Sequence, residues 1–199
     1  MARGVKLPPM ERVRKARVLT VAEISKLLEV LTDPTRTMFF LALSLGLRIG
    51  ELLPLRLEDL DLSAALLYVR RDYYRGHLQT PKTARSERRF KLPPLLLNVL
   101  SRYLENRRRQ SDLLFPNSAG TIFDDRNLIR REVEPVCDCL SIPRFGWHAL
   151  RHTSASTTML YTHAQDDAKQ AALETVARVL FPNVPNFGDV QESKEMLVQ

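Results

Sequence analysis

Apolar residues return every three or four positions from residue 20 onward, which predicts an amphipathic helix at the start of the folded region. The apolar stripe consists of Val21, Ile24, Leu27, Leu28 and Leu31. Thr20 stands just ahead of the stripe, and Glu23 follows three residues later. A hydroxyl residue and a glutamate at that spacing are typical of a capping box, in which each side chain bonds the other residue's backbone amide. The helix should therefore begin at Thr20.

A second helix is expected after a cap at Asp33, with Pro34 in its first turn, where no amide hydrogen is needed. Residues 38–45 are apolar nearly all round, so this helix should lie at the centre of the fold. Gly46 should end it. Residues 47–52 should then form a turn into a short helix.

The pattern changes between residues 65 and 92, where short runs rich in β-branched and aromatic residues are interpreted as strands. The three expected strands are 66–69, 73–79 and 88–92. The last two are joined by a polar, basic connection that includes Lys82 and Arg85. The sequence thus predicts a small three-stranded antiparallel sheet that carries Lys82 near a turn.

The remaining segments predict helices joined by turns, so the expected fold class is mainly α with this small sheet. A helix should open at Pro93-Pro94 and end in the basic run 107–109, and a later helix, capped by Asp124 or Asp125, should bend at Pro135. Further expected features are a short buried segment at 113–116, a turn at 117–121 and an amphipathic helix at 166–180.

Three regions are expected along the chain. Residues 1–19 form a basic arm or interdomain linker, residues 20–181 the folded domain and residues 182–199 a loose tail. Arg12, Arg14 and Lys15 lie in the arm. They belong either to a disordered tail or to a segment that lies on phosphates.

Charge favours a polyanionic partner. The 199 residues include 30 Lys and Arg against 23 Asp and Glu, a formal net charge of +7. No apolar run reaches the length of a membrane span, and no secretory leader is expected at the basic start. Cys137 and Cys139 are too close for an ordinary disulfide and too few for a zinc site. They are interpreted as reduced thiols in a cytosolic compartment.

Candidate chemistry gathers at residues 145–163. His148 and Arg151 are three residues apart, so on a helix they share one face. An imidazole beside a bidentate guanidinium can hold a phosphoryl oxygen, and the hydroxyl of Tyr161 could attack the phosphorus. An H-x-x-R pair alone more often marks a solvated helix face. His152 adds H-x-x-x-H spacing, but no glutamate follows the first histidine, so no metal is expected.

Arg48 offers a further cationic group, because it follows an apolar helix closely. Such an arginine needs either an anion or a structural partner, which would be Glu51 or the C-terminus of a helix. Lys82 and Arg85, in the expected loop, could contact a groove or a phosphate, but any exposed loop can carry such residues.

Taken in order, four segments resemble the catalytic domain of the tyrosine recombinases, the phage-integrase family. They are GLRIGEL at 46–52, TPKT at 80–83 with the strand SERRFKL at 86–92, HALRHT at 148–153 and TTMLYTH at 157–163. The likeness covers roughly residues 18–181 and implies the DNA breaking-rejoining fold of these enzymes. It also implies double-stranded DNA as a partner, other protomers of the same chain on that DNA, and a bacterial-type cytoplasmic protein that associates with the nucleoid.

The resemblance implies a mechanism without a cofactor. Tyr161 would attack a DNA phosphodiester to form a 3′-phosphotyrosyl bond, while Arg48 and Arg151 hold the non-bridging oxygens. Lys82 would protonate the leaving oxygen, and His148 would assist proton transfer. Lys82, Arg85, Arg12, Arg14 and Lys15 would also contact the DNA. Arg48 should then lie close to Arg151 and His148 in space.

The sequence departs from the family in one respect that bears on activity. Family members have further helices, with another active-site histidine or tryptophan, between the H-x-x-R box and the nucleophile, whereas nine residues separate Arg151 from Tyr161 here. If one helix ran through both, Tyr161 would lie about 15 Å along the axis from Arg151. We therefore expect Tyr161 to miss its own cluster and to serve a neighbouring protomer, unless the chain breaks near 154–158.

The departure leaves two possibilities within the family: an active recombinase or a catalytically inactive DNA-binding member. A type IB topoisomerase is a further alternative. It uses the same kind of nucleophile and clamp, but the compact motifs of this chain resemble those of the recombinases more closely. The family's DNA-clamping helical domain is also expected to be missing ahead of Thr20.

Overall fold

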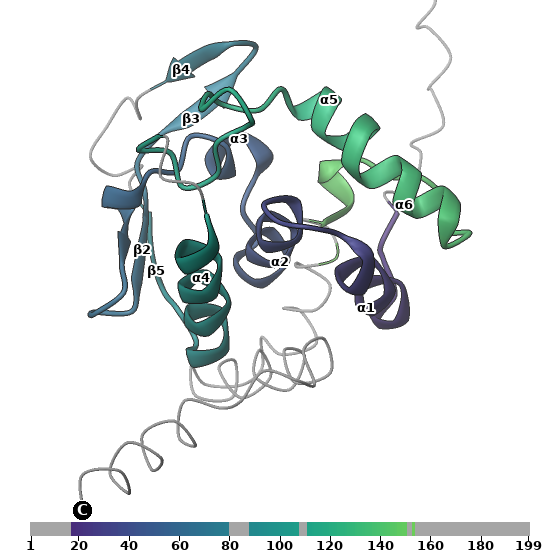
Figure 1. Ribbon diagram of the computed structural model, residues 1–199, viewed down its shortest axis with the longest axis horizontal. Helices are drawn as coiled ribbons and strands as arrows, with labels where there is room; N and C mark the ends of the chain where they lie inside the picture. Colours follow the sequence, from purple (N-terminus) through teal and green to yellow (C-terminus); the bar gives the residue numbers. More distant parts are fainter. Residues whose placement is uncertain (1–16, 80–87, 108–110, 151–152, 154–199) are drawn as a thin grey trace, which may run out of the picture.

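The computed structural model describes residues 17–79, 88–107, 111–150 and 153. Helix α2 (Thr35–Leu45) lies at the centre, packed against α4 (Pro94–Asn106) and α1 (Val21–Val30) (Figure 1). Met38 and Phe39 of α2 have no exposed surface, as the apolar pattern all round this helix predicted. The helix is therefore the core element around which the others pack.

The ends of the first two helices follow the predicted side-chain chemistry. The hydroxyl of Thr20 accepts from the amide of Glu23 at 3.2 Å, and the Glu23 carboxylate accepts from the amide of Thr20 at 2.8 Å. Asp33 accepts from the amide and the hydroxyl of Thr37 at 3.2 and 2.6 Å, which satisfies a free donor at the start of α2. Gly46 ends α2 with a left-handed φ of 66°.

A three-stranded antiparallel sheet lies beside α4, as Figure 1 shows. Its order is β1 (Leu60–Asp61), β2 (Leu66–Val69) and β5 (Arg88–Lys91). Leu67 of β2 pairs with Phe90 of β5 and is fully buried. The predicted number of strands is confirmed, but one member differs, because β1 takes the place expected for residues 73–79.

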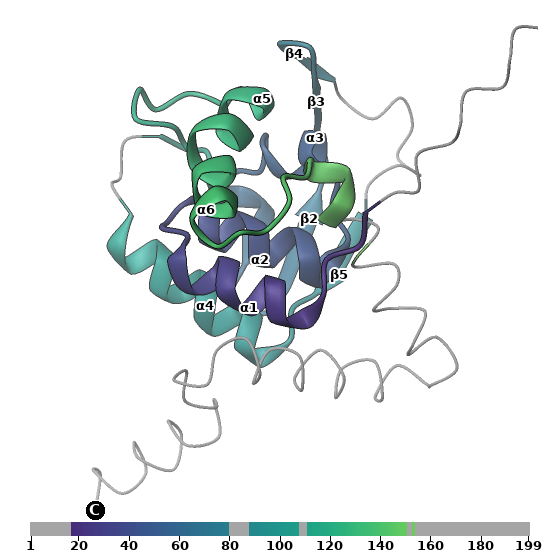
Figure 2. The same ribbon diagram turned by 90° about the vertical axis from the view of Figure 1, so that its right-hand side faces the viewer.

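Residues 73–79 were expected to form one strand of this sheet, and that expectation is wrong. They belong instead to a separate hairpin made of β3 (Asp72–Tyr74) and β4 (His77–Gln79). Arg75 and Gly76 have φ values of 50° and 83°. Two successive left-handed residues form the tight turn that reverses a two-stranded hairpin. The hairpin lies against α3 at its base, and its far end extends beyond the helices (Figure 2).

A buried carboxylate fixes the segment between α3 (Ile49–Leu52) and the sheet. Asp59, in the 3₁₀ turn η1 (Leu57–Asp59), is 1% exposed. It accepts from the guanidinium of Arg71 at 2.7 Å and from that of Arg70 at 3.3 Å. Arg71 also pairs with Glu58. Two carboxylates therefore balance two arginines at this place.

The helix expected from Asp125 to about Leu140 has three parts. These are α5 (Asp125–Leu128), a π-helical stretch η3 (Ile129–Val133) and α6 (Glu134–Cys139). Within the π-helical stretch the amide of Glu134 bonds the carbonyl of Ile129, five residues earlier. Pro135 follows directly and has no amide hydrogen for the regular pattern, which accounts for the irregularity at the predicted bend.

The thiols of Cys137 and Cys139 are both free, and burial raises the pKa of Cys137. Among the helices of the described residues, none has the length and apolar character that crossing a membrane requires.

Candidate active site

Arg48 stands at the cap of α3, where its own side chain and backbone both meet Glu51. The Arg48 amide donates to one Glu51 oxygen at 2.9 Å, and its guanidinium donates to the other at 3.1 Å. The Glu51 side chain is 10% exposed, whereas that of Arg48 is 56% exposed. Of the partners that the sequence left open for Arg48, the structure shows Glu51. More than half of the Arg48 side chain is nevertheless exposed to solvent.

Arg88, the first residue of β5, reaches the same carboxylate. Its guanidinium lies 2.5 Å from Glu51 Oε1 and 5.5 Å from the centre of the Phe90 ring. Sequence reasoning treated Arg88 only as a strand residue. The sequence of the strand does not indicate this contact, because Glu51 lies on a different element.

Gly50 lets α3 approach the β3–β4 hairpin closely. A Cβ atom at this position would lie 2.2 Å from Asp72 Oδ1 and 2.8 Å from the carbonyl oxygen of Tyr73. Both distances are shorter than van der Waals contact. The glycine between Arg48 and Glu51 therefore fixes where the arginine sits relative to the hairpin.

His148 lies in a helix whose described residues are 147–150 and 153, with its side chain exposed and Ala149 and Leu150 buried. Two aromatic residues that precede His148 hold this helix against α2. Phe145 and Trp147 both pack on Phe39 of α2, with ring centres 5.8 and 6.2 Å apart. The Trp147 indole also donates to the carbonyl of Asp125 at 3.3 Å. In both views this helix lies on the same side of α2 as α3 (Figures 1 and 2).

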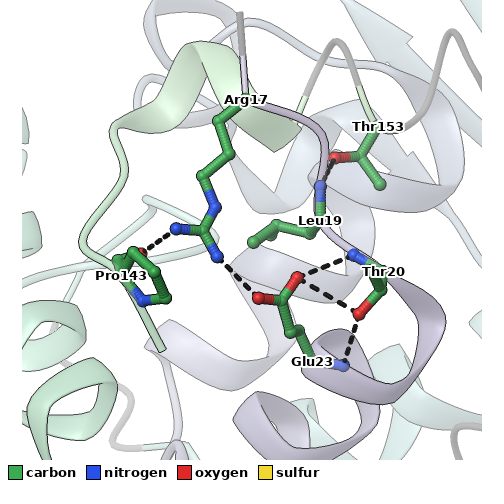
Figure 3. A network of polar contacts seen from close by, with 6 residues as sticks. All are labelled: Arg17, Leu19, Thr20, Glu23, Pro143 and Thr153. Carbon is green, nitrogen blue, oxygen red and sulfur yellow. Dashed lines mark hydrogen bonds and ion pairs between the residues drawn. The ribbon is translucent and has the colours of Figure 1, made fainter. Parts of the chain in front are cut away.

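The segment that leads into α1 also bonds to Thr153 of this helix and to Pro143 ahead of it (Figure 3). The amide of Leu19 donates to the hydroxyl of Thr153 at 2.9 Å, and that hydroxyl donates to the carbonyl of Ala149 at 2.8 Å. Arg17 donates to the carbonyl of Pro143 at 2.7 Å and to the Glu23 carboxylate at 2.6 Å. We refer to these contacts as the Arg17–Thr153 clasp.

The Glu23 carboxylate in this clasp has a shifted pKa. Hydrogen bonds from Thr20, the backbone bond foremost, and the charge of Arg17 lower the pKa of Glu23. The carboxylate is thereby kept ionised where it pairs with Arg17. Sequence reasoning found the Thr20–Glu23 half of this network and missed the half that reaches residues 143–153.

Two of the predicted catalytic residues, Arg48 and His148, are among those that the structure describes. The others, Lys82, Arg151 and Tyr161, lie outside the described residues, as do the predicted DNA contacts, which are Lys82, Arg85, Arg12, Arg14 and Lys15. The expected closeness of Arg48 and Arg151 and the reach of Tyr161 therefore stay predictions.

A sequence profile of the phage integrase family matches residues 17–173. The chain belongs to this family, the tyrosine recombinases. The resemblance carried by the four segments is thereby confirmed.

Curated relatives agree with this membership. The chain is 27% identical over 205 residues to a tyrosine recombinase XerC-like protein of Caldanaerobacter subterraneus, covering 77% of this chain and 52% of the relative. It is 34% identical over 113 residues to a putative prophage phiRv2 integrase of Mycobacterium tuberculosis, covering 53% of this chain and 30% of the relative. The chain thus spans about half or less of the length of these relatives.

Solved structures agree on the fold. The integrase of transposon Tn1549, in complex with a circular intermediate DNA, matches with a TM-score of 0.67 at 17% identity, covering 95% of this chain and 68% of that one. The XerA recombinase matches with a TM-score of 0.59 at 22% identity, covering 96% and 66%. The predicted fold class, the recombinase catalytic core with a small antiparallel sheet, is confirmed.

Proposed function

We propose that this chain is the catalytic core of a site-specific recombinase that cleaves and rejoins double-stranded DNA through Tyr161. The observation that carries the proposal is Arg48. Within the matched family region, its side chain is 56% exposed although the carboxylate that holds it is buried. A guanidinium held on one side and open on the other is suited to grip a phosphate that arrives from solution.

In the proposed reaction the phenol oxygen of Tyr161 attacks the phosphorus of a DNA phosphodiester. A phosphorus–oxygen bond to tyrosine forms as the bond to the 5′ oxygen breaks, and Lys82 gives that oxygen its proton. Arg48 and Arg151 balance the charge on the non-bridging oxygens, and His148 assists the proton transfer from the phenol. One phosphoester bond replaces another, so the step can be reversed on a second DNA end and needs no ATP.

The short distance in sequence between Arg151 and Tyr161 favours a nucleophile that serves another protomer. In this arrangement Arg48, His148 and Arg151 of one copy hold the phosphate that Tyr161 of a neighbouring copy attacks. The same short segment also favours a second candidate function, a catalytically inactive member of the family that binds DNA without cutting it.

One experiment separates these readings. The chain is mixed with DNA duplexes of random sequence that carry bridging phosphorothiolates, whose thiol leaving group cannot reverse the reaction. We expect a covalent protein–DNA adduct that resists denaturation, is abolished by Tyr161→Phe and is reduced about 10²-fold by Arg48→Gln. Salt-sensitive DNA binding without any adduct would establish the inactive binder, and neither binding nor adduct would overturn both functions.

A mixing experiment tests donation between protomers. Tyr161→Phe lacks the nucleophile, and Arg48→Gln lacks the clamp but keeps Tyr161. If Tyr161 acts on a neighbour, the two impaired variants together should regain adduct, and the DNA should be attached to the Arg48→Gln chain. Failure of the mixture to regain adduct, with the parent active, would place the nucleophile in its own chain.

Double-stranded DNA is the proposed partner, in the bacterial cytoplasm where the nucleoid lies. A net charge of +7 supports this partner. Binding should weaken linearly in a plot of log affinity against log salt, because each neutralised phosphate releases counterions.

A further inference from the structure

The carboxylate of Glu51 serves two arginines with a single oxygen. Oε1 lies 3.1 Å from a guanidinium nitrogen of Arg48 and 2.5 Å from one of Arg88. These two nitrogens are therefore less than about 6 Å apart, because both touch the same atom. The other oxygen, Oε2, accepts from the backbone amide of Arg48.

The contacts of the two arginines are unequal. Arg88 makes the shorter contact with Glu51 Oε1, 2.5 Å against 3.1 Å for Arg48. Arg48 makes the longer contact and has the more exposed side chain, 56% against 46% for Arg88. Arg88 therefore contacts the carboxylate more closely, whereas Arg48 is held through its backbone amide as well as its side chain.

The ion pairs of Glu51 leave one positive charge over. Among the described residues they join one carboxylate, that of Glu51, to two guanidiniums, so these three groups together carry a net charge of +1. The cluster around Asp59 is different, because Glu58 supplies a second carboxylate to the arginine pair there. Two like charges side by side repel each other. The excess at Glu51 suits an incoming anion.

We propose that Arg88 is a positioning residue for Arg48. By neutralising Glu51, Arg88 leaves the Arg48 guanidinium free to turn toward a DNA phosphate. Without Arg88, Glu51 and Arg48 would form a closed neutral pair, and the phosphate would have to compete with a buried carboxylate. This inference rests on the proposed function of Arg48 as a phosphate clamp.

Four variants test the proposal. Arg88→Gln removes the neutralising charge, and Arg88→Lys restores the charge. Arg89→Gln is the matched control, because Arg89 is the neighbouring exposed arginine on the same strand. Glu51→Gln removes the charge through which Arg88 is proposed to act. Circular dichroism of each variant verifies that the fold is kept.

The first measurement is adduct formation on the phosphorothiolate duplexes at saturating DNA. Arg88→Gln should lower the rate at least tenfold, Arg88→Lys should restore most of the rate, and Arg89→Gln should change it less than twofold. DNA affinity should fall equally in Arg88→Gln and Arg89→Gln, since each loses one charge. In the Glu51→Gln background, Arg88→Gln should have no further effect on the rate.

The second measurement needs no catalysis, so it stands even if the chain is an inactive binder. Nuclear magnetic resonance of the Arg48 guanidinium reports how freely the group rotates. Rotation should be slower in Arg88→Gln than in the parent, and Arg89→Gln should leave it unchanged. Equal rotation in all three proteins, or an Arg88→Gln effect that persists in the Glu51→Gln background, would overturn the role of Arg88 while leaving the proposed function intact.

Discussion

The amide of Leu19 donates a 2.9 Å hydrogen bond to the hydroxyl of Thr153, which lies 134 residues further along the chain. Leu19 is 3% exposed and Thr153 is 2% exposed. Thr153 comes two residues after Arg151, so this bond ties the entry of α1 to the helix of the H-x-x-R box. Through the Arg17–Thr153 clasp, the position of His148 thus depends on a segment that lies far from it in the sequence.

Replacing Thr153 by valine tests the clasp. The change keeps the shape of the side chain but leaves the buried Leu19 amide without its acceptor, which should cost about 1–3 kcal/mol of unfolding free energy. Thr153→Ser keeps the hydroxyl and should cost about 1 kcal/mol or less. Denaturant unfolding and hydrogen exchange at the Leu19 amide measure both effects. An amide equally protected in the valine variant would show that the bond does not hold the segment.

Gly50→Ala should push α3 away from the β3–β4 hairpin. The new Cβ would meet Asp72 Oδ1 at 2.2 Å and the Tyr73 carbonyl oxygen at 2.8 Å. The carbonyl belongs to the backbone, so relief requires movement of the hairpin, at a cost of about 1–3 kcal/mol. Gly146→Ala is the control, because a Cβ there meets nothing within 4 Å. Thermal unfolding of the two variants compares them, and equal losses would contradict the packing argument.

The pH dependence of stability should include a contribution from Glu23. Its pKa is lowered in the folded state, by the Thr20 backbone bond first and by Arg17 among other causes. The stabilisation is therefore complete above the unfolded-state pKa of about 4.3 and is lost as the pH falls through the lower folded-state pKa. Glu23→Gln should be less stable than the parent near neutral pH, and the difference should shrink below about pH 4. A difference that stays constant across this range would show that the charge of Glu23 contributes nothing.

Tyr103 should limit stability at alkaline pH. Its hydroxyl donates to the carbonyl of Leu114 at 2.9 Å, and burial raises its pKa to about 12. In the unfolded chain the pKa of a tyrosine is about 10. The stabilisation is therefore fully present below about pH 10 and is lost between about pH 10 and 12. Tyr103→Phe should flatten this decline, whereas Tyr74→Phe, at a 56% exposed position, should not. Denaturant unfolding from pH 8 to 12 provides the comparison.

Local features of the fold could be predicted from the sequence because neighbouring residues determine them. The capping box at Thr20 and Glu23, the cap at Asp33 and the helix stop at Gly46 each depend on groups within four or five positions. The irregular helical stretch just before Pro135 is of the same kind, whereas the bend expected there stays a prediction. The other three features were found from spacing and residue type alone.

Features that join distant segments could not be predicted in the same way. The hairpin turn at Arg75 and Gly76 lacks the usual asparagine or aspartate at its first position, so residues 73–79 looked like one strand. The contact of Arg88 with Glu51 and that of Leu19 with Thr153 depend on how whole elements pack. Sequence periodicity places residues on faces, and it does not say which faces meet.

Trp147 is the only tryptophan of the chain, and it stands directly before His148. Its indole N–H bonds the carbonyl of Asp125 while its ring leans on Phe39. Indole emission depends on the polarity around the ring, so detachment of this helix from α2 and α5 would shift the fluorescence of the native protein to the red. The molecule thus carries its own optical reporter beside the candidate active site, readable in stopped flow without a label.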